Sequence, residues 1–151
     1  ANMTMLSNLA GYSPEGAFKN ASFHAFYLYS KNCHGTSLDV STSCETYSNN
    51  VFSDIPYLDV TAVLNDEAKT LVLNVVNRHE TDEITGNIVL QTGEFTGSAT
   101  ASVVNGKISA SDNPRAEEPV TVTSADIKFK GNEIRYTFPA HSLTQLLVPL
   151  K

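Results

Sequence analysis

Alternating apolar and polar positions predict β-strands along most of this chain. In residues 57–65, Leu58 and Val60 fall on one side and Asp59 falls on the other. This period of two is typical of a strand with one buried face. Residues 70–76 follow a polar turn and complete a predicted hairpin. Further strands are predicted at residues 84–91, 97–104, 120–129, 133–138 and 142–148.

An aromatic run at residues 23–29 is apolar on both sides. Phe23 and Tyr27 fall on one side of an extended chain, and Phe26 and Leu28 fall on the other. A strand with two apolar faces is typical of a sheet that is covered on both sides. We therefore predict a buried strand here.

The first twelve residues show a different pattern. Met3, Leu6 and Leu9 recur near helical spacing, and Gly11 stands where a helix would end. The pattern predicts a short N-terminal helix within residues 1–12. Such a helix is marginal in water unless it packs on something larger.

Strands that recur along the chain, with turn residues between them, indicate an all-β fold. Asn105-Gly106 and Gly131-Asn132 lie between predicted strands, where residues that tolerate positive φ are favoured. Residues 112–119 contain two prolines and three acidic residues, and we predict a surface loop there. The expected architecture is an antiparallel, jelly-roll-like β-sandwich over residues 13–151, preceded by the short helix.

Composition narrows the class of partner. The chain has 151 residues, which is room for one domain, and a formal net charge of −6 with only 10 lysines and arginines. Nucleic acids and anionic membranes bind basic surfaces, so we expect neither as a partner. No apolar run reaches the length of about 18 residues that a bilayer-spanning helix needs.

Two features predict a secreted, extracellular protein. Asn2-Met3-Thr4 and Asn20-Ala21-Ser22 are acceptor triplets, so Asn20 and Asn2 are predicted N-glycosylation sites. Cys33 and Cys44 are the only cysteines, and their short spacing in a polar stretch predicts a disulfide around a small loop. The alternative is a pair of unpaired thiols in a cytosolic protein. Neither cysteine belongs to a C-x-x-C pair, which argues against a redox or zinc role.

The sequence contains no motif for a catalytic, metal or cofactor site. The histidines lack metal-ligand spacing, and neither a Gly-x-Ser-x-Gly elbow nor a glycine-rich phosphate loop occurs, so we predict no cofactor. Glycoside hydrolysis needs two opposed carboxyls across a cleft, whereas the adjacent acids here fall on polar turns and should stay hydrated. Oxygen ligands from loop Asp and Asn residues leave calcium as an alternative. The residues concerned are His24, His34, His79 and His141, and the acid pairs Asp66/Glu67, Asp82/Glu83 and Glu117/Glu118.

Aromatic residues near loops are compatible with a carbohydrate-binding surface. Sugar-binding modules stack exposed rings on carbohydrate faces, and Tyr12, Tyr47, Phe52 and Tyr57 fall in or near predicted loops. The alternative is that the core takes up these rings.

Five segments in a fixed order carry a family resemblance. They are ANMTMLSNLAGY, AFKNASFHAFYLYSKNCHGTSL, the hairpin PYLDVTAVLNDEAKTLVLNVVNRHETDEI with its Val76-Asn77-Arg78 close, the Asp112-Asn113-Pro114 loop and the ending PAHSLTQLLVPL. Together they resemble the C-terminal part of glycoside hydrolase family 51, the α-L-arabinofuranosidases, over nearly the whole chain. The first segment is similar to the last helix of that family's (β/α)₈ barrel, and the others are similar to its β-sandwich.

The resemblance implies a non-catalytic β-sandwich of an enzyme that removes arabinose side chains from arabinoxylan or arabinan by a retaining mechanism. The family's two catalytic glutamates lie on barrel strands that would precede Ala1, so neither maps onto this chain. The family's sandwich also takes strands from the start of the full polypeptide. The implied partners are the catalytic barrel of the same enzyme and, through it, plant cell-wall polysaccharide. The cysteine pair and the acceptor triplets suggest a eukaryotic, fungal version.

A free-standing carbohydrate-binding or lectin-like module is the alternative function. The predicted N-terminal helix distinguishes the accessory domain from the free-standing module, because an exposed apolar stripe on Met3, Leu6 and Leu9 would mark a missing partner. A self-sufficient module has no need of such a stripe.

Overall fold

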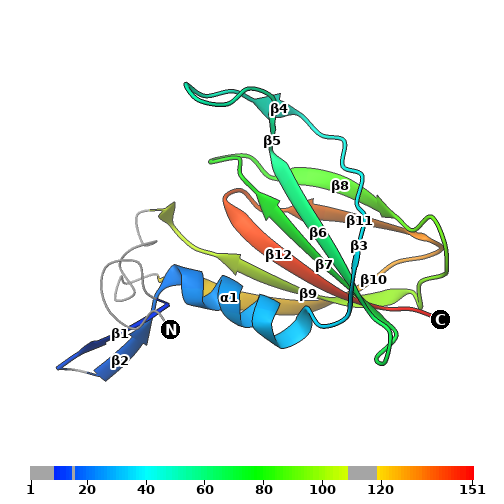
Figure 1. Ribbon diagram of the computed structural model, residues 1–151, viewed down its shortest axis with the longest axis horizontal. Helices are drawn as coiled ribbons and strands as arrows, with labels where there is room; N and C mark the ends of the chain where they lie inside the picture. The colour runs from blue at the N-terminus through cyan, green and yellow to red at the C-terminus, as the bar shows by residue number, and fades with distance from the viewer. Residues whose placement is uncertain (1–8, 15, 109–118) are drawn as a thin grey trace.

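A six-stranded antiparallel sheet forms the centre of the computed structural model, which describes residues 9–14, 16–108 and 119–151 (Figure 1). This main sheet contains β3 (Thr36–Leu38), β6 (Leu58–Asn65), β7 (Thr70–Asn77), β9 (Ser98–Asn105), β10 (Thr121–Lys128) and β12 (Ser142–Pro149). Their order across the sheet is β10-β9-β12-β7-β6-β3.

Two shorter strands form a second layer over one face of the main sheet. β8 (Ile84–Val89) and β11 (Glu133–Phe138) pair with each other. Ile134 and Phe138 of β11 are fully buried in one core cluster with Leu73 and Leu146 of the main sheet. The chain is therefore an antiparallel β-sandwich, as the sequence predicted.

The burial pattern of β7 explains why this strand could be predicted from the sequence. Leu71, Leu73 and Val75 face the second layer, while Val72 lies on the opposite side of the pleat, and all four are buried. A strand covered on both faces shows a nearly continuous apolar run. All seven strands predicted from residue 57 onward are confirmed, with ends that agree within two residues; they correspond to β6, β7, β8, β9, β10, β11 and β12.

A helix, α1 (Ala21–Asn32), lies across the other face of the main sheet (Figure 1). Leu28 is its buried residue, and it packs in a second core cluster with Val104 and Leu143. The predicted strand at residues 23–29 is therefore wrong. Short runs that are apolar on both sides fit a strand or a helix equally well, and the aromatic content misleadingly favoured a strand.

The N-terminal region is a β-hairpin where the structure describes it. β1 (Ala10–Ser13) pairs with β2 (Gly16–Lys19), with Ala10 opposite Lys19. The helix predicted within residues 1–12 therefore does not include residues 10–12, because the backbone there is extended and paired. Residues 1–8 of that prediction lie outside the described residues, as do residues 112–118 of the predicted surface loop.

A small hairpin projects from the sandwich beyond one end of β6 (Figure 1). β4 (Thr46–Tyr47) pairs with β5 (Ile55–Pro56). Its turn is closed by Asn49, whose side-chain Oδ1 accepts from the backbone N–H groups of Val51 at 2.8 Å and Phe52 at 2.7 Å. Among the described residues, no helix has both the length and the apolar character needed to cross a bilayer.

Candidate functional site

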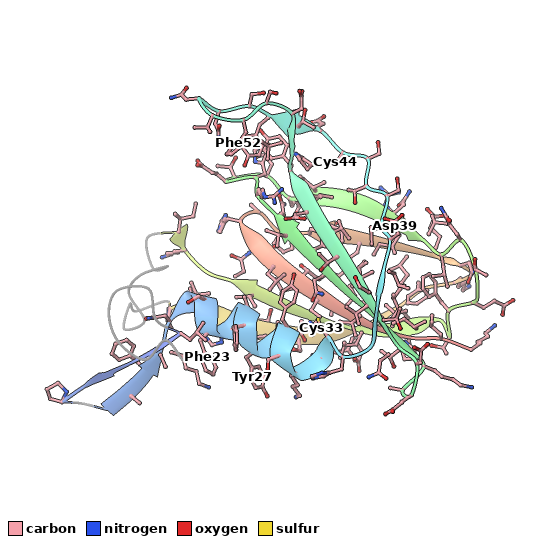
Figure 2. The ribbon with its side chains drawn as sticks, in the orientation of Figure 1. Phe23, Tyr27, Cys33, Asp39, Cys44 and Phe52 are labelled. Atoms are coloured by element: carbon pink, nitrogen blue, oxygen red, sulfur yellow. The ribbon has the colours of Figure 1, made fainter. Side chains whose placement is uncertain are left out.

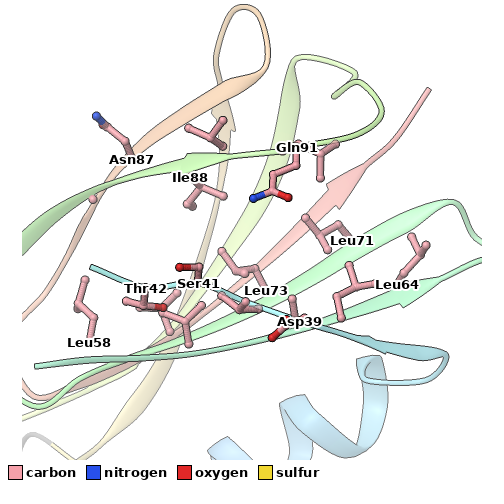
Figure 3. A pocket seen from close by; sticks show the side chains of 18 of the residues that line it. Asp39, Ser41, Thr42, Leu58, Leu64, Leu71, Leu73, Asn87, Ile88 and Gln91 are labelled. Carbon is pink, nitrogen blue, oxygen red and sulfur yellow. The ribbon is translucent and has the colours of Figure 1, made fainter. Parts of the chain in front are cut away.

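A groove of about 640 Å³ opens between the main sheet and β8 (Figure 3). Leu64, Leu71 and Leu73 of β6 and β7 line one wall, and Ile88 of β8 lines the other. The segment 39–43, which follows β3, also lines it. Because six strands face a layer of only two among the described residues, part of the apolar face of β6 and β7 has no strand opposite it.

Polar groups line the rim of this groove, but they do not form a catalytic pair. The hydroxyls of Ser41 and Thr42 and the amides of Asn87 and Gln91 can donate and accept hydrogen bonds. Asp39 is the one carboxyl among the described residues that line the groove. Glycoside hydrolysis needs a second, opposed carboxyl, which the described lining of this groove does not supply.

The paired acids that the structure describes lie on loops, as predicted. Asp66 and Glu67 follow β6, and Asp82 and Glu83 precede β8, and all four are exposed. Asp82 Oδ1 accepts from the Thr81 hydroxyl at 2.8 Å. Glu117 and Glu118 lie outside the described residues. None of the four described acids lines the groove.

The four histidines serve local contacts, and two of them are neighbours, because the His141 backbone N–H donates to the His79 carbonyl at 2.8 Å. His34 Nε2 lies 2.8 Å from the Ser30 carbonyl, and His79 Nδ1 accepts from the Asp82 backbone N–H at 2.9 Å. Both ring nitrogens of His141 lie at backbone carbonyls. Burial, with a smaller contribution from Lys19, lowers the pKa of His24 below its usual value. No group of three or more His, Cys, Asp or Glu side chains placed to hold a metal ion occurs among the described residues.

The predicted Cys33–Cys44 disulfide is not formed. Both cysteines are free and half-buried, in contact with different strands (Figure 2). Cys33 Sγ accepts from Asn74 Nδ2 at 3.3 Å under α1, while Cys44 Sγ accepts from the Leu58 backbone N–H at 3.5 Å. Short sequence spacing misled the prediction, because α1 ends at one cysteine and β3 lies between the two.

The structure brings together two of the four residues of the predicted aromatic platform. The Tyr57 ring lies between Tyr47 at 4.9 Å and His79 at 4.6 Å, measured between centroids. Phe52 lies in the turn between β4 and β5, with 65% of its surface exposed (Figure 2). The side chain of Tyr12 lies outside the described residues, and β1 is at the opposite end of the molecule (Figure 1).

Of the two predicted glycosylation sites, Asn20 lies within the described residues and Asn2 does not. Asn20 is the N-cap residue of α1, with an extended backbone, and is partly exposed.

Two features of α1 were not predicted from the sequence. Beneath the helix, the side-chain amides of Asn74 and Gln145 form a buried polar cluster. On its outer side, Phe26 and Tyr27 are 58% and 48% exposed. The i,i+4 spacing of Phe23 and Tyr27 was the available signal for a helix, but it also fits the same face of a strand.

The family profile described as "Alpha-L-arabinofuranosidase C-terminal domain" matches residues 3–142. The chain belongs to this family of α-L-arabinofuranosidase C-terminal domains.

Curated α-L-arabinofuranosidases are similar to this chain over part of their length. A probable alpha-L-arabinofuranosidase C from Aspergillus niger is 31% identical over 141 residues, which is 89% of this chain and 26% of that protein. An intracellular exo-alpha-(1->5)-L-arabinofuranosidase from Halalkalibacterium halodurans is 31% identical over 68 residues, which is 45% of this chain and 14% of that protein. This chain therefore spans about a quarter, or less, of the length of these curated relatives.

A solved structure shares the fold. The thermostable GH51 alpha-L-arabinofuranosidase from Thermotoga petrophila RKU-1 matches with a TM-score of 0.76 at 22% identity. The match covers 93% of this chain and 31% of that chain.

Proposed function

We propose that this chain is the non-catalytic C-terminal β-sandwich of a secreted α-L-arabinofuranosidase, and that it supports the catalytic domain of the same polypeptide. Membership of the family and the fraction of each relative that is matched support this assignment. The substrate would be the arabinose side chains of arabinoxylan or arabinan, and the catalytic glutamates would lie outside these residues.

The observation that carries the proposal is the open groove beside β8. Its walls include buried core residues such as Leu71 and Leu73, so this surface continues the core into an opening. An open groove that is lined by core leucines offers a surface that a partner can cover. Extended segments from the start of the full polypeptide, which the family resemblance implies, would add strands beside β8 and cover β6 and β7.

The acidic side chains that the structure describes favour a non-catalytic role for this domain. Retaining glycoside hydrolysis needs two carboxyls about 5–5.5 Å apart, one acting as nucleophile and one as acid and base. The groove offers Asp39 alone, and the described acid pairs are exposed on loops. On this proposal, turnover depends on residues elsewhere in the enzyme.

The experiment compares this chain with the full-length polypeptide from its native source. Intact mass should show these residues within a much longer polypeptide, and that polypeptide should hydrolyse an aryl α-L-arabinofuranoside while the chain of residues 1–151 does not. Turnover by residues 1–151 that is lost on Asp82→Ala or Glu83→Ala would overturn the proposal. A native protein of only this length that binds arabino-oligosaccharides without turnover would instead identify a free-standing carbohydrate-binding module.

Secretion is a separate part of the proposal. The free cysteines remove one of its two supports, and the acceptor triplet at Asn20 is the other. Peptide mass spectrometry on native material should find glycan on Asn20. A bare Asn20 would favour the intracellular location that the name of the Halalkalibacterium relative gives for that protein.

A further inference from the structure

Helix α1 has two apolar sides, and the sandwich covers only one of them. The inner side buries Leu28 against Val104 and Leu143. On the outer side, Phe26 and Tyr27 remain 58% and 48% exposed, and Phe23 lies beside Tyr27 (Figure 2). Large apolar side chains that stay exposed together on one face of a helix are typical of a surface that a partner covers. The outer side of α1 is therefore an unpartnered surface.

This outer surface is ordered by contacts among its own side chains. The rings of Phe23 and Tyr27 stack with 6.1 Å between centroids and 10° between planes. Lys19 Nζ lies 4.9 Å from the centroid of Phe23, and Lys31 Nζ lies 5.6 Å from that of Tyr27. We call Lys19, Phe23, Phe26, Tyr27 and Lys31 the α1 outer patch. Its aromatic rings are flanked by a cation at each end, as cation–π pairs favour.

The α1 outer patch also differs in charge from the rest of the chain. Residues 16–38 contain Lys19 and Lys31 and no Asp or Glu, although the chain as a whole has a net charge of −6. Complementary potentials favour the contact of a basic patch with a partner surface that carries carboxylates around an apolar centre.

The polar cluster beneath α1 holds the helix in one position on the sheet. Gln145 Nε2 donates to the Leu28 carbonyl at 3.2 Å, Asn32 Nδ2 donates to Gln145 Oε1, and Cys33 Sγ accepts from Asn74. These directional bonds fix the rotation of the helix, because each requires a particular side of α1 to face the sheet. The aromatic side is thereby preset to face outward.

We propose that the α1 outer patch is the surface through which this domain packs against the preceding, catalytic part of the same polypeptide. This inference rests on the proposed function. The family profile describes a C-terminal domain, and this chain spans 26% of the Aspergillus niger relative, so a large preceding domain is expected. The β1–β2 hairpin directly precedes α1 in the chain and leads into the N-terminus of this helix (Figure 1).

A second copy of this chain fits the patch less well. A two-fold interface places the same patch on both copies, so the lysines of one copy would meet the lysines of the other. Like charges in contact oppose such an association. An acidic and apolar surface on a different domain has no such conflict.

The experiment measures amine acetylation in the full-length enzyme, with Lys69 and Lys130 as exposed internal controls. Lys19 and Lys31 should react at least about tenfold more slowly than the controls, which corresponds to an interface open for a tenth of the time or less. Phe26→Asp should bring both lysines close to the control rate, since it places a carboxylate among the partner's expected carboxylates. Phe52→Asp changes an equally exposed ring on the β4–β5 hairpin and should leave the ratio unchanged.

The outcomes separate this inference from the proposed function. Lys19 and Lys31 reacting as fast as Lys69 and Lys130, in an enzyme that still hydrolyses an aryl arabinofuranoside, would overturn the docking surface alone. Protection that falls on dilution, together with a dimer in sedimentation, would also overturn it in favour of a second copy. The comparison of lysine rates needs only the unmodified enzyme, so it remains decisive if Phe26→Asp does not fold.

Discussion

The side-chain amide of Gln145 donates from Nε2 to Asn74 Oδ1 at 2.7 Å, directly across the β12–β7 pairing. Both residues are almost completely buried beneath α1. Asn74 Nδ2 reaches Thr61 Oγ1 at 3.3 Å as well as Cys33 Sγ. A polar cluster whose members are all hydrogen-bonded specifies how the helix sits on the sheet.

Breaking this pair from one side should destabilise the domain. Gln145→Leu leaves Asn74 Oδ1 and the Asn32 amide without their partner, which should lower the free energy of unfolding by about 1–3 kcal/mol. Asn74→Leu should cost a similar amount. In the double variant neither amide is left unpaired by the loss of the other. The loss of unfolding free energy in the double variant should therefore be smaller than the sum of the two single losses by at least about 0.5 kcal/mol. Urea unfolding of the four proteins measures this, and strictly additive costs would show that the two amides do not act together.

A second buried amide pins one end of the sandwich. Asn77 Nδ2 donates to the carbonyls of Asp82 at 3.0 Å, Phe138 at 3.1 Å and Pro139 at 3.0 Å. Asn77→Ala removes this donor from all three carbonyls, of which the Pro139 carbonyl keeps the Ser142 hydroxyl at 2.7 Å. The substitution should lower the free energy of unfolding by about 2–4 kcal/mol. Asn87→Ala on the exposed side of β8 is the control and should change it by less than about 0.5 kcal/mol. Equal effects of the two substitutions in thermal unfolding would contradict a pinning role for Asn77.

The strands could be predicted from the sequence because their burial alternates or is complete. β6 alternates over residues 58–62, β7 is buried on both faces, and turn residues mark their ends. The polar cluster could not be found in this way. Asn74 and Gln145 each interrupt an apolar strand, and a single polar residue in a strand normally indicates a position that faces solvent. Here the position is covered by a helix that the sequence pattern had not distinguished from a strand.

The groove and the outer patch of α1 were invisible for a different reason. Apolar residues such as Leu64, Leu71 and Phe26 predict burial, but the sequence does not state which element covers them. Phe26 was assigned to a buried strand, whereas it lies exposed on a helix. The predicted disulfide was wrong for a similar reason, because spacing along the chain carries no information about the direction in which two side chains point.

The two free thiols predict insensitivity to reductant. A disulfide that closed so small a loop would stabilise the domain by about 2–3 kcal/mol. The urea midpoint should therefore be unchanged by dithiothreitol, and iodoacetamide should alkylate both Cys33 and Cys44 once the chain is unfolded without reductant. A midpoint that falls on reduction, with a linked peptide in a non-reduced digest, would contradict the structure.

Acid should weaken the packing of α1 through His24. Burial, followed by the nearby charge of Lys19, lowers the pKa of His24 in the folded chain below its ordinary value of 6.5. Below pH 6.5 the unfolded chain therefore takes up the proton first, so the free energy of unfolding decreases as pH falls toward the lowered folded-state pKa. Above pH 6.5 the imidazole is neutral in both states and contributes no slope. His24→Gln should flatten the pH dependence below pH 6.5 relative to the unmodified chain. An identical slope in the two proteins would show that other groups set it.

The connection between α1 and β3 depends on the absence of a side chain at Gly35. Its φ is +135°, and an added Cβ would lie 2.0 Å from the Leu64 carbonyl oxygen, a backbone atom of the neighbouring strand. Gly35→Ala must therefore move either the turn or β6, and Thr36 pairs with Leu64 in the next position. We expect it to lower the free energy of unfolding by about 3 kcal/mol or more. Gly131 is the matched control, because its φ is +75° and an added Cβ would meet nothing within 4 Å. Gly131→Ala carries only the conformational cost, about 1–2 kcal/mol. If urea unfolding gave both substitutions the same cost, the close approach of Gly35 to Leu64 would not hold in solution, and β3 would be free to pair in another register.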